Sequence, residues 1–386
     1  MQKRRFWITG AAVGAGGLGL AAACGAVIVA SRLIDEFIKP HRSLAEEQEY
    51  WKIPQEWRIS LTEGGFEPPP SRHRSLTFCA ADGPRLRGDF WAQPQPAPTM
   101  VICHGYRTAS MHLHPLAALE YALGYNVMLF DFRGHGESES VFTSGGTAEV
   151  NDLLAALTVA SQQPETLPGK ICIHGFSMGA SIALLALPHY EVAALIADSP
   201  YVYFDEILRR LVGYRYALSQ RDAPAKELSY QAHTPAALII RAIIAVGFLV
   251  FRMRFGYPLK NRLDTRFKHW KTMSEKPFHP SRPPTPVLLI QAMGDELIPI
   301  EHTCQLVARA KKYGVPMEVY FVDHATHCGA FKHNPQQYIA VLQHFVAHHL
   351  GDDLMTNAVQ ERRILDFLYR QAQQESAASF PLLSAL

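Results

Sequence analysis

Ser177 has the local setting that a nucleophilic serine requires. It stands between two glycines in Gly175-Phe176-Ser177-Met178-Gly179, after an apolar run and before a helical pattern. Glycines on both sides permit a sharp strand-to-helix turn that exposes the hydroxyl at a helix N-terminus, where developing negative charge is stabilised. The motif therefore predicts that Ser177 is a nucleophile.

A serine hydroxyl needs a base to take its proton and a third group to orient that base. Asp295 follows the apolar run 287–291, and His327 lies in the loop after the apolar run 317–322. Both side chains are expected just past strand ends that follow Ser177 in the chain. We predict that Asp295 orients His327 and that His327 is the general base.

Two neighbouring residues remain alternatives for these roles. His324 lies in the same loop as His327, and Asp198 follows the apolar run 192–197. His327 is preferred as the base because it lies deeper in the loop and is followed by small residues that lead into the final helix.

Acyl transfer also needs donors for the oxyanion of its tetrahedral intermediate. One expected donor is the backbone N–H of Met178, directly after the nucleophile. The other is the N–H of Tyr106, in the loop that begins at His104-Gly105. No residue is assigned to a metal ion or an organic cofactor, since the histidine pairs lack the further converging ligands of a zinc site.

Short apolar runs alternate with helical stretches over most of the chain, and this order predicts a doubly wound, mostly parallel α/β sheet. The exception is an insertion at about 200–286, where the apolar stretch 235–251 predicts a helical cap. Expected strands are 75–79, 86–92, 100–103, 126–130, 170–174, 192–197, 287–291 and 317–322, and expected helices are 111–123, 149–161, 178–187, 302–312 and 335–349.

The N-terminus carries an uncharged stretch from Phe6 to Ser31, long enough to cross a bilayer as a helix. A transmembrane anchor is the preferred interpretation, and a cleaved export signal and a buried helix remain open. The basic cluster Lys3-Arg4-Arg5 favours an N-terminus inside, with the catalytic domain on the outer, periplasmic or extracellular, face. We expect an anchor or signal over 1–31, a linker over 32–72, the main domain over 73–350 and an extension over 351–386.

Composition narrows the class of protein. The chain of 386 residues is 48% hydrophobic and 19% charged, with a net charge of +2. This balance indicates a globular protein, and the sequence lacks the excess of basic residues that is typical of nucleic-acid-binding proteins. Six cysteines without a C-x-x-C pair predict neither a disulfide framework nor a structural zinc site.

Residues 75–350 resemble the α/β-hydrolase superfamily. The matching motifs are His104-Gly105, Asp131–Ser138, Gly175–Gly179, Gly294-Asp295 and His327. Within the superfamily, the chain is similar to membrane-anchored bacterial hydrolases described as serine aminopeptidase-like. The resemblance implies a serine hydrolase without metal or organic cofactor, and it departs from the usual pattern at Cys328, where glycine often follows the histidine.

The predicted function is hydrolysis of acyl esters through a Ser-Asp-His triad and a covalent acyl-enzyme. The alternatives are an amide or peptide hydrolase of the same mechanism and a non-catalytic binding protein, since a triad alone does not select the leaving group. The expected partners are a small or lipid-like acyl substrate and, through the N-terminal helix, a membrane. The stretch Asp131–Ser138 is expected to brace a turn.

Overall fold

The computed structural model describes residues 24–32, 34–39, 70–204, 206–208, 210, 235–255 and 284–350. The chain divides into two compact units, one of residues 1–38 and 208–260 and the other of 39–207 and 261–386. Most of the expected anchor and linker, and the whole expected extension 351–386, lie outside the described residues.

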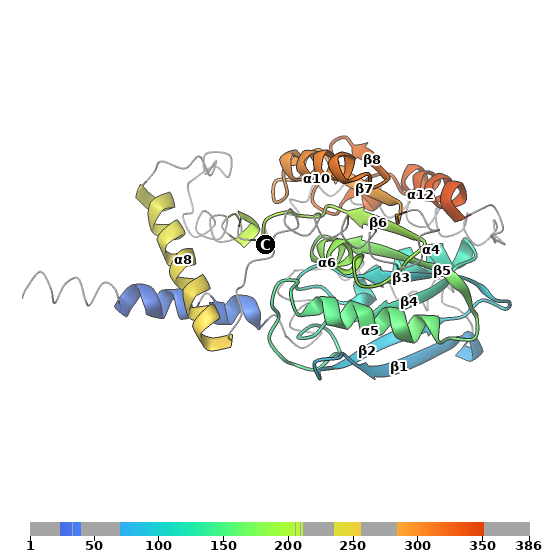
Figure 1. Ribbon diagram of the computed structural model, residues 1–386, viewed down its shortest axis with the longest axis horizontal. Coiled ribbons are helices and arrows are strands. Elements are labelled where there is room, and N and C mark those ends of the chain that lie inside the picture. Colours follow the sequence, from blue (N-terminus) through green and yellow to red (C-terminus); the bar gives the residue numbers. More distant parts are fainter. Residues whose placement is uncertain are drawn as a thin grey trace, which may run out of the picture. The chain divides into compact units, whose positions relative to one another are not determined.

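The larger unit is built on an eight-stranded sheet with the order β1-β2-β4-β3-β5-β6-β7-β8, which runs from one edge to the other in Figure 1. β2 pairs antiparallel with β1 and with β4, and every pair from β4 to β8 is parallel. The predicted mostly parallel sheet is therefore confirmed. The strands are β1 (His73–Cys79), β2 (Arg85–Trp91), β3 (Ala97–Cys103), β4 (Asn126–Phe130), β5 (Thr166–Phe176), β6 (Ala194–Asp198), β7 (Val287–Ala292) and β8 (Met317–Val322).

The helices follow the predicted order. One expected helix is divided, because Pro115 lies in the first turn of α4, where its missing N–H costs nothing. The helical elements of this unit with described bounds are η2 (Pro70–Arg72), η3 (Ser110–Leu113), α4 (His114–Ala122), α5 (Glu149–Ser161), α6 (Met178–Ala186), α10 (Ile300–Tyr313), α11 (Ala330–His333) and α12 (Pro335–Leu350).

Helices α4 and α12 cover the same face of the sheet. Cys172 and Phe176 of β5 lie in one buried cluster with side chains from both helices. Alternate residues of a strand point to the same face, so His174 points towards α4 and α12 as well. Helices α5 and α6 pack against each other and against β5.

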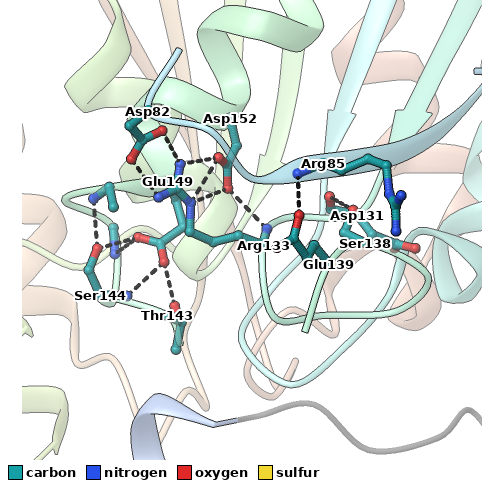
Figure 2. A network of polar contacts seen from close by, with 12 residues as sticks. Asp82, Arg85, Asp131, Arg133, Ser138, Glu139, Thr143, Ser144, Glu149 and Asp152 are labelled. Atoms are coloured by element: carbon teal, nitrogen blue, oxygen red, sulfur yellow. Dashed lines mark hydrogen bonds and ion pairs between the residues drawn. The ribbon is translucent and has the colours of Figure 1, made fainter. Parts of the chain in front are cut away.

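The loop after β4 is held by the ion pairs of Arg133 with the buried Asp152 and the exposed Asp82, which Figure 2 shows. The Arg133 guanidinium donates to both carboxylate oxygens of Asp152 on α5, with contacts of 2.5 to 3.0 Å, and to Asp82 at 2.7 Å. The Glu149 carboxylate accepts hydrogen bonds from the hydroxyls of Thr143 and Ser144. Arg133 therefore braces this loop, as expected from the sequence.

The smaller unit pairs an N-terminal helix, described over 24–32 and 34–38, with α8 (Pro235–Phe255). Ile34 lies against Gly247, where a Cβ would come within 3.1 Å of its side chain. Arg254 donates to Asp35 at 2.6 Å. The apolar stretch 235–251, expected to be helical, is thus the greater part of α8.

The expected membrane anchor gains no support from the described residues. Of the stretch Phe6–Ser31, only the part from Cys24 onward is described, as part of the N-terminal helix. Within the described ranges, none of the helices combines the length and the hydropathy needed to cross a membrane.

Candidate active site

Ser177 occupies the turn between β5 and α6 with φ 49° and ψ −110°. Residues other than glycine rarely adopt this backbone conformation. The flanking glycines explain how the turn closes. A Cβ on Gly175 would lie 2.7 Å from the backbone nitrogen of Ala180, and one on Gly179 would lie 2.6 Å from the carbonyl oxygen of His104. A side chain at either position would clash with the facing backbone and open the turn. The two glycines of the motif are therefore required for this turn.

The structure brings Ser177, His327 and Asp295 together. His327 Nε2 lies 2.9 Å from Ser177 Oγ, and His327 Nδ1 lies 2.7 Å from Asp295 Oδ2. The other carboxylate oxygen of Asp295 accepts the N–H groups of Leu297 at 3.0 Å and Ile298 at 2.8 Å. Asp295 is held from both sides, and it fixes the imidazole so that Nε2 faces the serine hydroxyl.

The surroundings of His327 favour its protonated form. Burial alone would lower its pKa, but the neighbouring Cys328 and Asp295 raise that pKa well above the usual value. Burial raises the pKa of the Cys328 thiol itself. A neutral thiol carries no charge to act on the imidazole, so Asp295 is the charged neighbour that favours the protonated form of His327.

The side chains of the two alternative residues do not take part in this hydrogen-bonded set. The side chain of His324 is exposed in a turn with φ 60°. Asp198 is fully buried at the end of β6, where its carboxylate accepts the hydroxyls of Tyr338 at 3.0 Å and Ser199 at 2.9 Å. Among the described residues, neither the His324 side chain nor the Asp198 carboxylate is hydrogen-bonded to Ser177 Oγ or to the His327 imidazole.

Both expected oxyanion donors border Ser177. Met178 is the first residue of α6, and the first N–H groups of a helix have no partner within it. A Cβ on Gly105 would lie 3.6 Å from Ser177 Cβ, so the loop that carries Tyr106 passes beside the nucleophile. This arrangement can present backbone N–H groups to an oxygen held near Ser177 Oγ.

Two further residues adjoin the site and were not assigned roles from the sequence. Cys328 Sγ lies 3.6 Å from His327 Nε2, and the Cys328 N–H donates to Ser199 Oγ at 3.3 Å. The sequence signals were that Cys328 directly follows the predicted base, where it departs from the usual glycine, and that Ser199 directly follows Asp198.

Within the described residues, one cluster has ligand atoms close enough to hold a metal ion. It consists of Glu318 on β8 and of His348 and His349 near the end of α12, with all ligand atoms within 4.8 Å of one another. Glu318 and His348 are exposed, and none of these three described residues is hydrogen-bonded to Ser177, His327 or Asp295.

Two family profiles match the chain. The serine aminopeptidase (S33) family matches residues 94–246, which include Ser177, and the prolyl oligopeptidase family matches residues 253–353, which include Asp295 and His327. The two matches together contain all three residues of the hydrogen-bonded set described above.

Several curated proteins are similar in sequence. The uncharacterized protein YqkD of Bacillus subtilis is 28% identical over 272 residues, covering 69% of this chain and 77% of YqkD. The uncharacterized protein YfhR of Salmonella typhi is 26% identical over 193 residues, covering 45% of this chain and 65% of YfhR. The thiohydrolase aneE of Aspergillus aculeatus is 30% identical over 115 residues, covering 29% of this chain and 36% of that enzyme.

Solved structures share the fold. The esterase Pf2001 of Pyrococcus furiosus superposes with a TM-score of 0.53 at 22% identity, covering 74% of this chain and all of that chain. A second crystal form of the same esterase gives a TM-score of 0.54. This likeness concerns the fold alone.

Proposed function

We propose that this chain, which is an enzyme of the α/β-hydrolase type, hydrolyses acyl esters by way of a covalent acyl-enzyme. Ser177 Oγ attacks the ester carbonyl carbon while its proton passes to His327 Nε2. The resulting oxyanion is held by the N–H groups of Met178 and Tyr106. The intermediate collapses, the C–O bond breaks, and the departing alcohol takes the proton from His327.

The second half of the reaction repeats the first with water. His327 Nε2 takes a proton from water as its oxygen attacks the acyl carbon on Ser177. Collapse of this second intermediate releases the carboxylic acid and returns the proton to Ser177 Oγ. Asp295 remains ionised throughout and stabilises the imidazolium that forms twice in each cycle.

One observation carries this proposal: Ser177 Oγ, His327 and Asp295 form a continuous hydrogen-bond chain with lengths of 2.9 and 2.7 Å. Both lengths lie within the reach that proton transfer requires. The three residues come from the ends of different strands, so their meeting is not a consequence of neighbouring positions in the sequence.

A second candidate is an amide or peptide hydrolase with the same residues. It is favoured by the descriptions of the two matching families, serine aminopeptidase and prolyl oligopeptidase. Because one of the similar proteins is a thiohydrolase, thioesters are a third class of substrate to test. All three substrates share the acyl carbon that Ser177 attacks and differ in the leaving group.

The experiment combines labelling with a substrate panel. A fluorophosphonate is expected to label wild-type protein and to spare Ser177→Ala, which should fold normally and lose turnover. The panel contains p-nitrophenyl esters from acetate to decanoate, a butyryl thioester and aminoacyl p-nitroanilides. Faster turnover of esters supports the leading proposal, and faster turnover of anilides favours the amide candidate. A folded Ser177→Ala variant with wild-type turnover would remove the nucleophile assignment.

We further propose that the acyl group is lipid-like and that the protein is attached to a membrane, with its catalytic unit on the outer face. Support comes from apolar side chains that the two described helices of the smaller unit leave exposed, because exposed apolar surface can mark contact with a membrane. They are Val27, Ile28 and Val29 on the N-terminal helix and Leu238, Leu249 and Met253 on α8. The ester panel tests the lipid-like acyl group, since medium chains should then be hydrolysed faster than acetate.

A further inference from the structure

A line of buried hydrogen bonds runs from α4 towards the loop that carries His327. It begins at Glu120 on α4, whose Oε1 lies 2.7 Å from Nδ1 of His174 on β5. His174 Nε2 lies 2.9 Å from the hydroxyl of Tyr338 on α12, and that hydroxyl donates to Asp198 Oδ2 at 3.0 Å. These four residues are at most 1% exposed.

This line ends at both halves of the candidate active site. The Ser199 hydroxyl donates to Asp198 Oδ1 at 2.9 Å and accepts the N–H of Cys328, the neighbour of His327, at 3.3 Å. The backbone carbonyl of Asp198 accepts the N–H of Ser177 at 2.9 Å. Asp198 therefore links the nucleophile turn to the histidine loop. We call Glu120, His174, Tyr338, Asp198 and Ser199 the buried chain.

The donor and acceptor roles along the buried chain determine which atom carries each hydrogen-bonding proton. Tyr338 has one hydroxyl proton and donates it to Asp198, so His174 must donate to Tyr338 from Nε2. One further proton lies between His174 Nδ1 and Glu120 Oε1. The other oxygen of Glu120, Oε2, is buried without a hydrogen-bond partner among the described residues.

An unpartnered buried oxygen is far more costly on a carboxylate than on a neutral carboxylic acid. The surroundings of Glu120 therefore favour its protonated form, which donates to His174. Burial also raises the pKa of Glu120. Burial raises the pKa of Asp198 too, but hydroxyl donors reach both of its carboxylate oxygens. We therefore assign the negative charge of the buried chain to Asp198, the residue that adjoins the active site.

Three residues with strained backbone conformations are hydrogen-bonded to the buried chain or belong to it. Ser177, Ser199 and Cys328 have φ values of 49°, 53° and 51°, in the left-handed region that favours glycine. Such conformations persist only where the surrounding structure holds them. Each of the three residues is tied to Asp198, directly or through Ser199, by a hydrogen bond given above.

We propose that the buried chain positions Ser177 and His327 for the reaction. Asp198 and Ser199 act as positioning residues, and Tyr338, His174 and Glu120 anchor them to α12 and α4. This inference rests on the proposed function, because it concerns the alignment of that same site.

The test measures kcat and KM on p-nitrophenyl butyrate. Ser199→Ala removes the contact to the histidine loop, and Tyr338→Phe removes the donor to Asp198 while keeping the ring. Each is expected to lower kcat by about 10- to 100-fold, because misplacement of the base by about 1 Å impairs proton transfer. KM should stay within about 2-fold, since neither residue adjoins the substrate. The double variant should lose little more than the worse single variant, because both belong to one chain.

Thr99→Val is the matched control. The Thr99 and Thr166 hydroxyls form a buried hydrogen bond of 2.8 Å near the amino ends of β3 and β5, away from Ser177. Its loss should lower stability and leave kcat unchanged. Wild-type kcat in Ser199→Ala would overturn the positioning role, and this variant decides alone if Tyr338→Phe does not fold. Turnover by a folded Ser177→Ala variant would instead overturn the proposed function, so the two failures are distinguishable.

Discussion

His327 connects a buried carboxylate to the Ser177 hydroxyl, and its protonation state decides whether the serine can be activated. Only the neutral imidazole has a free Nε2 lone pair to take the serine proton. Asp295, 2.7 Å from Nδ1, stabilises the charged imidazolium. The same contact that orients the base therefore also raises the pH at which the base becomes available.

The pH profile of wild-type enzyme should reflect this. Since the pKa of His327 is raised well above its usual value of about 6.5, kcat/KM should fall as pH decreases through a midpoint above about 6.5. In Asp295→Asn the stabilising charge is gone, so His327 should titrate at lower pH, and kcat should fall by about 10⁴-fold. NMR titration of the His327 imidazole in both proteins measures the shift. A midpoint that stays unchanged in Asp295→Asn would contradict the assigned cause.

Sequence reasoning was well suited to some residues of this site and blind to others. Ser177 stands in a local motif, and Asp295 and His327 each follow an apolar run that ends at one sheet edge. The roles of Ser199 and Tyr338 had no signal in the sequence, because Ser199 meets Cys328 and Tyr338 meets Asp198 across more than a hundred residues. Only the folded chain shows that Tyr338 reaches Asp198.

At the scale of elements, the loop after β4 depends on an ion pair that water does not reach. Arg133 and Asp152 have side-chain exposures of 6% and 0%. Arg74 and Glu165 form a bidentate pair of the same chemistry, with exposures of 37% and 23%. The two pairs separate the effect of burial from the effect of pairing.

Asp152→Asn should lower the free energy of unfolding by about 3 kcal/mol, because it leaves the buried Arg133 partly uncompensated. Glu165→Gln should lower it by less than about 1 kcal/mol, since solvent screens that pair. Urea denaturation followed by circular dichroism gives both values. Equal losses in the two variants would show that burial does not increase the contribution of the Arg133–Asp152 pair to the free energy of unfolding.

Element boundaries show what a sequence pattern detects. β4 and β8 coincide with their predicted ranges because they are uninterrupted apolar or alternating runs between clear breaks. β5 begins four residues earlier than predicted, at Thr166, because the exposed Pro168 and Gly169 are residues that disfavour a strand in a sequence pattern. Hydrogen bonding to neighbouring strands extends β5 where side-chain burial does not.

At the scale of the whole molecule, the N-terminal helix belongs with a segment about 200 residues later. Ile34 packs on Gly247, and Asp35 pairs with Arg254. The sequence predicted a cap and an N-terminal helix, and nothing in either pattern indicated that they form one unit. The partner of a helix depends on complementary shape, which hydropathy does not encode.

This pairing sets where the chain can be shortened. If the stretch from Phe6 is an anchor, full-length protein should sediment with membranes and resist carbonate extraction. Removal of residues 1–22 should release an active enzyme into the carbonate-soluble fraction. Removal of residues 1–41 should also lower Tm relative to the protein that lacks only residues 1–22. In that longer deletion, α8 loses the helix that packs on Gly247. N-terminal sequencing distinguishes a cleaved signal from an anchor, and uncleaved full-length protein in the soluble fraction would contradict the anchor.

Gly179 joins the first turn of α6 to the end of β3 with no side chain between them. Because backbone meets backbone at His104, the nucleophile and the loop bearing Tyr106 must shift together or stay in place. During divergence, this joint tolerates no added carbon atom, because backbone on the facing side leaves no room for one. New substrate preferences in descendants of this chain should therefore arise from substitutions elsewhere, while the spacing between nucleophile and oxyanion loop is inherited unchanged.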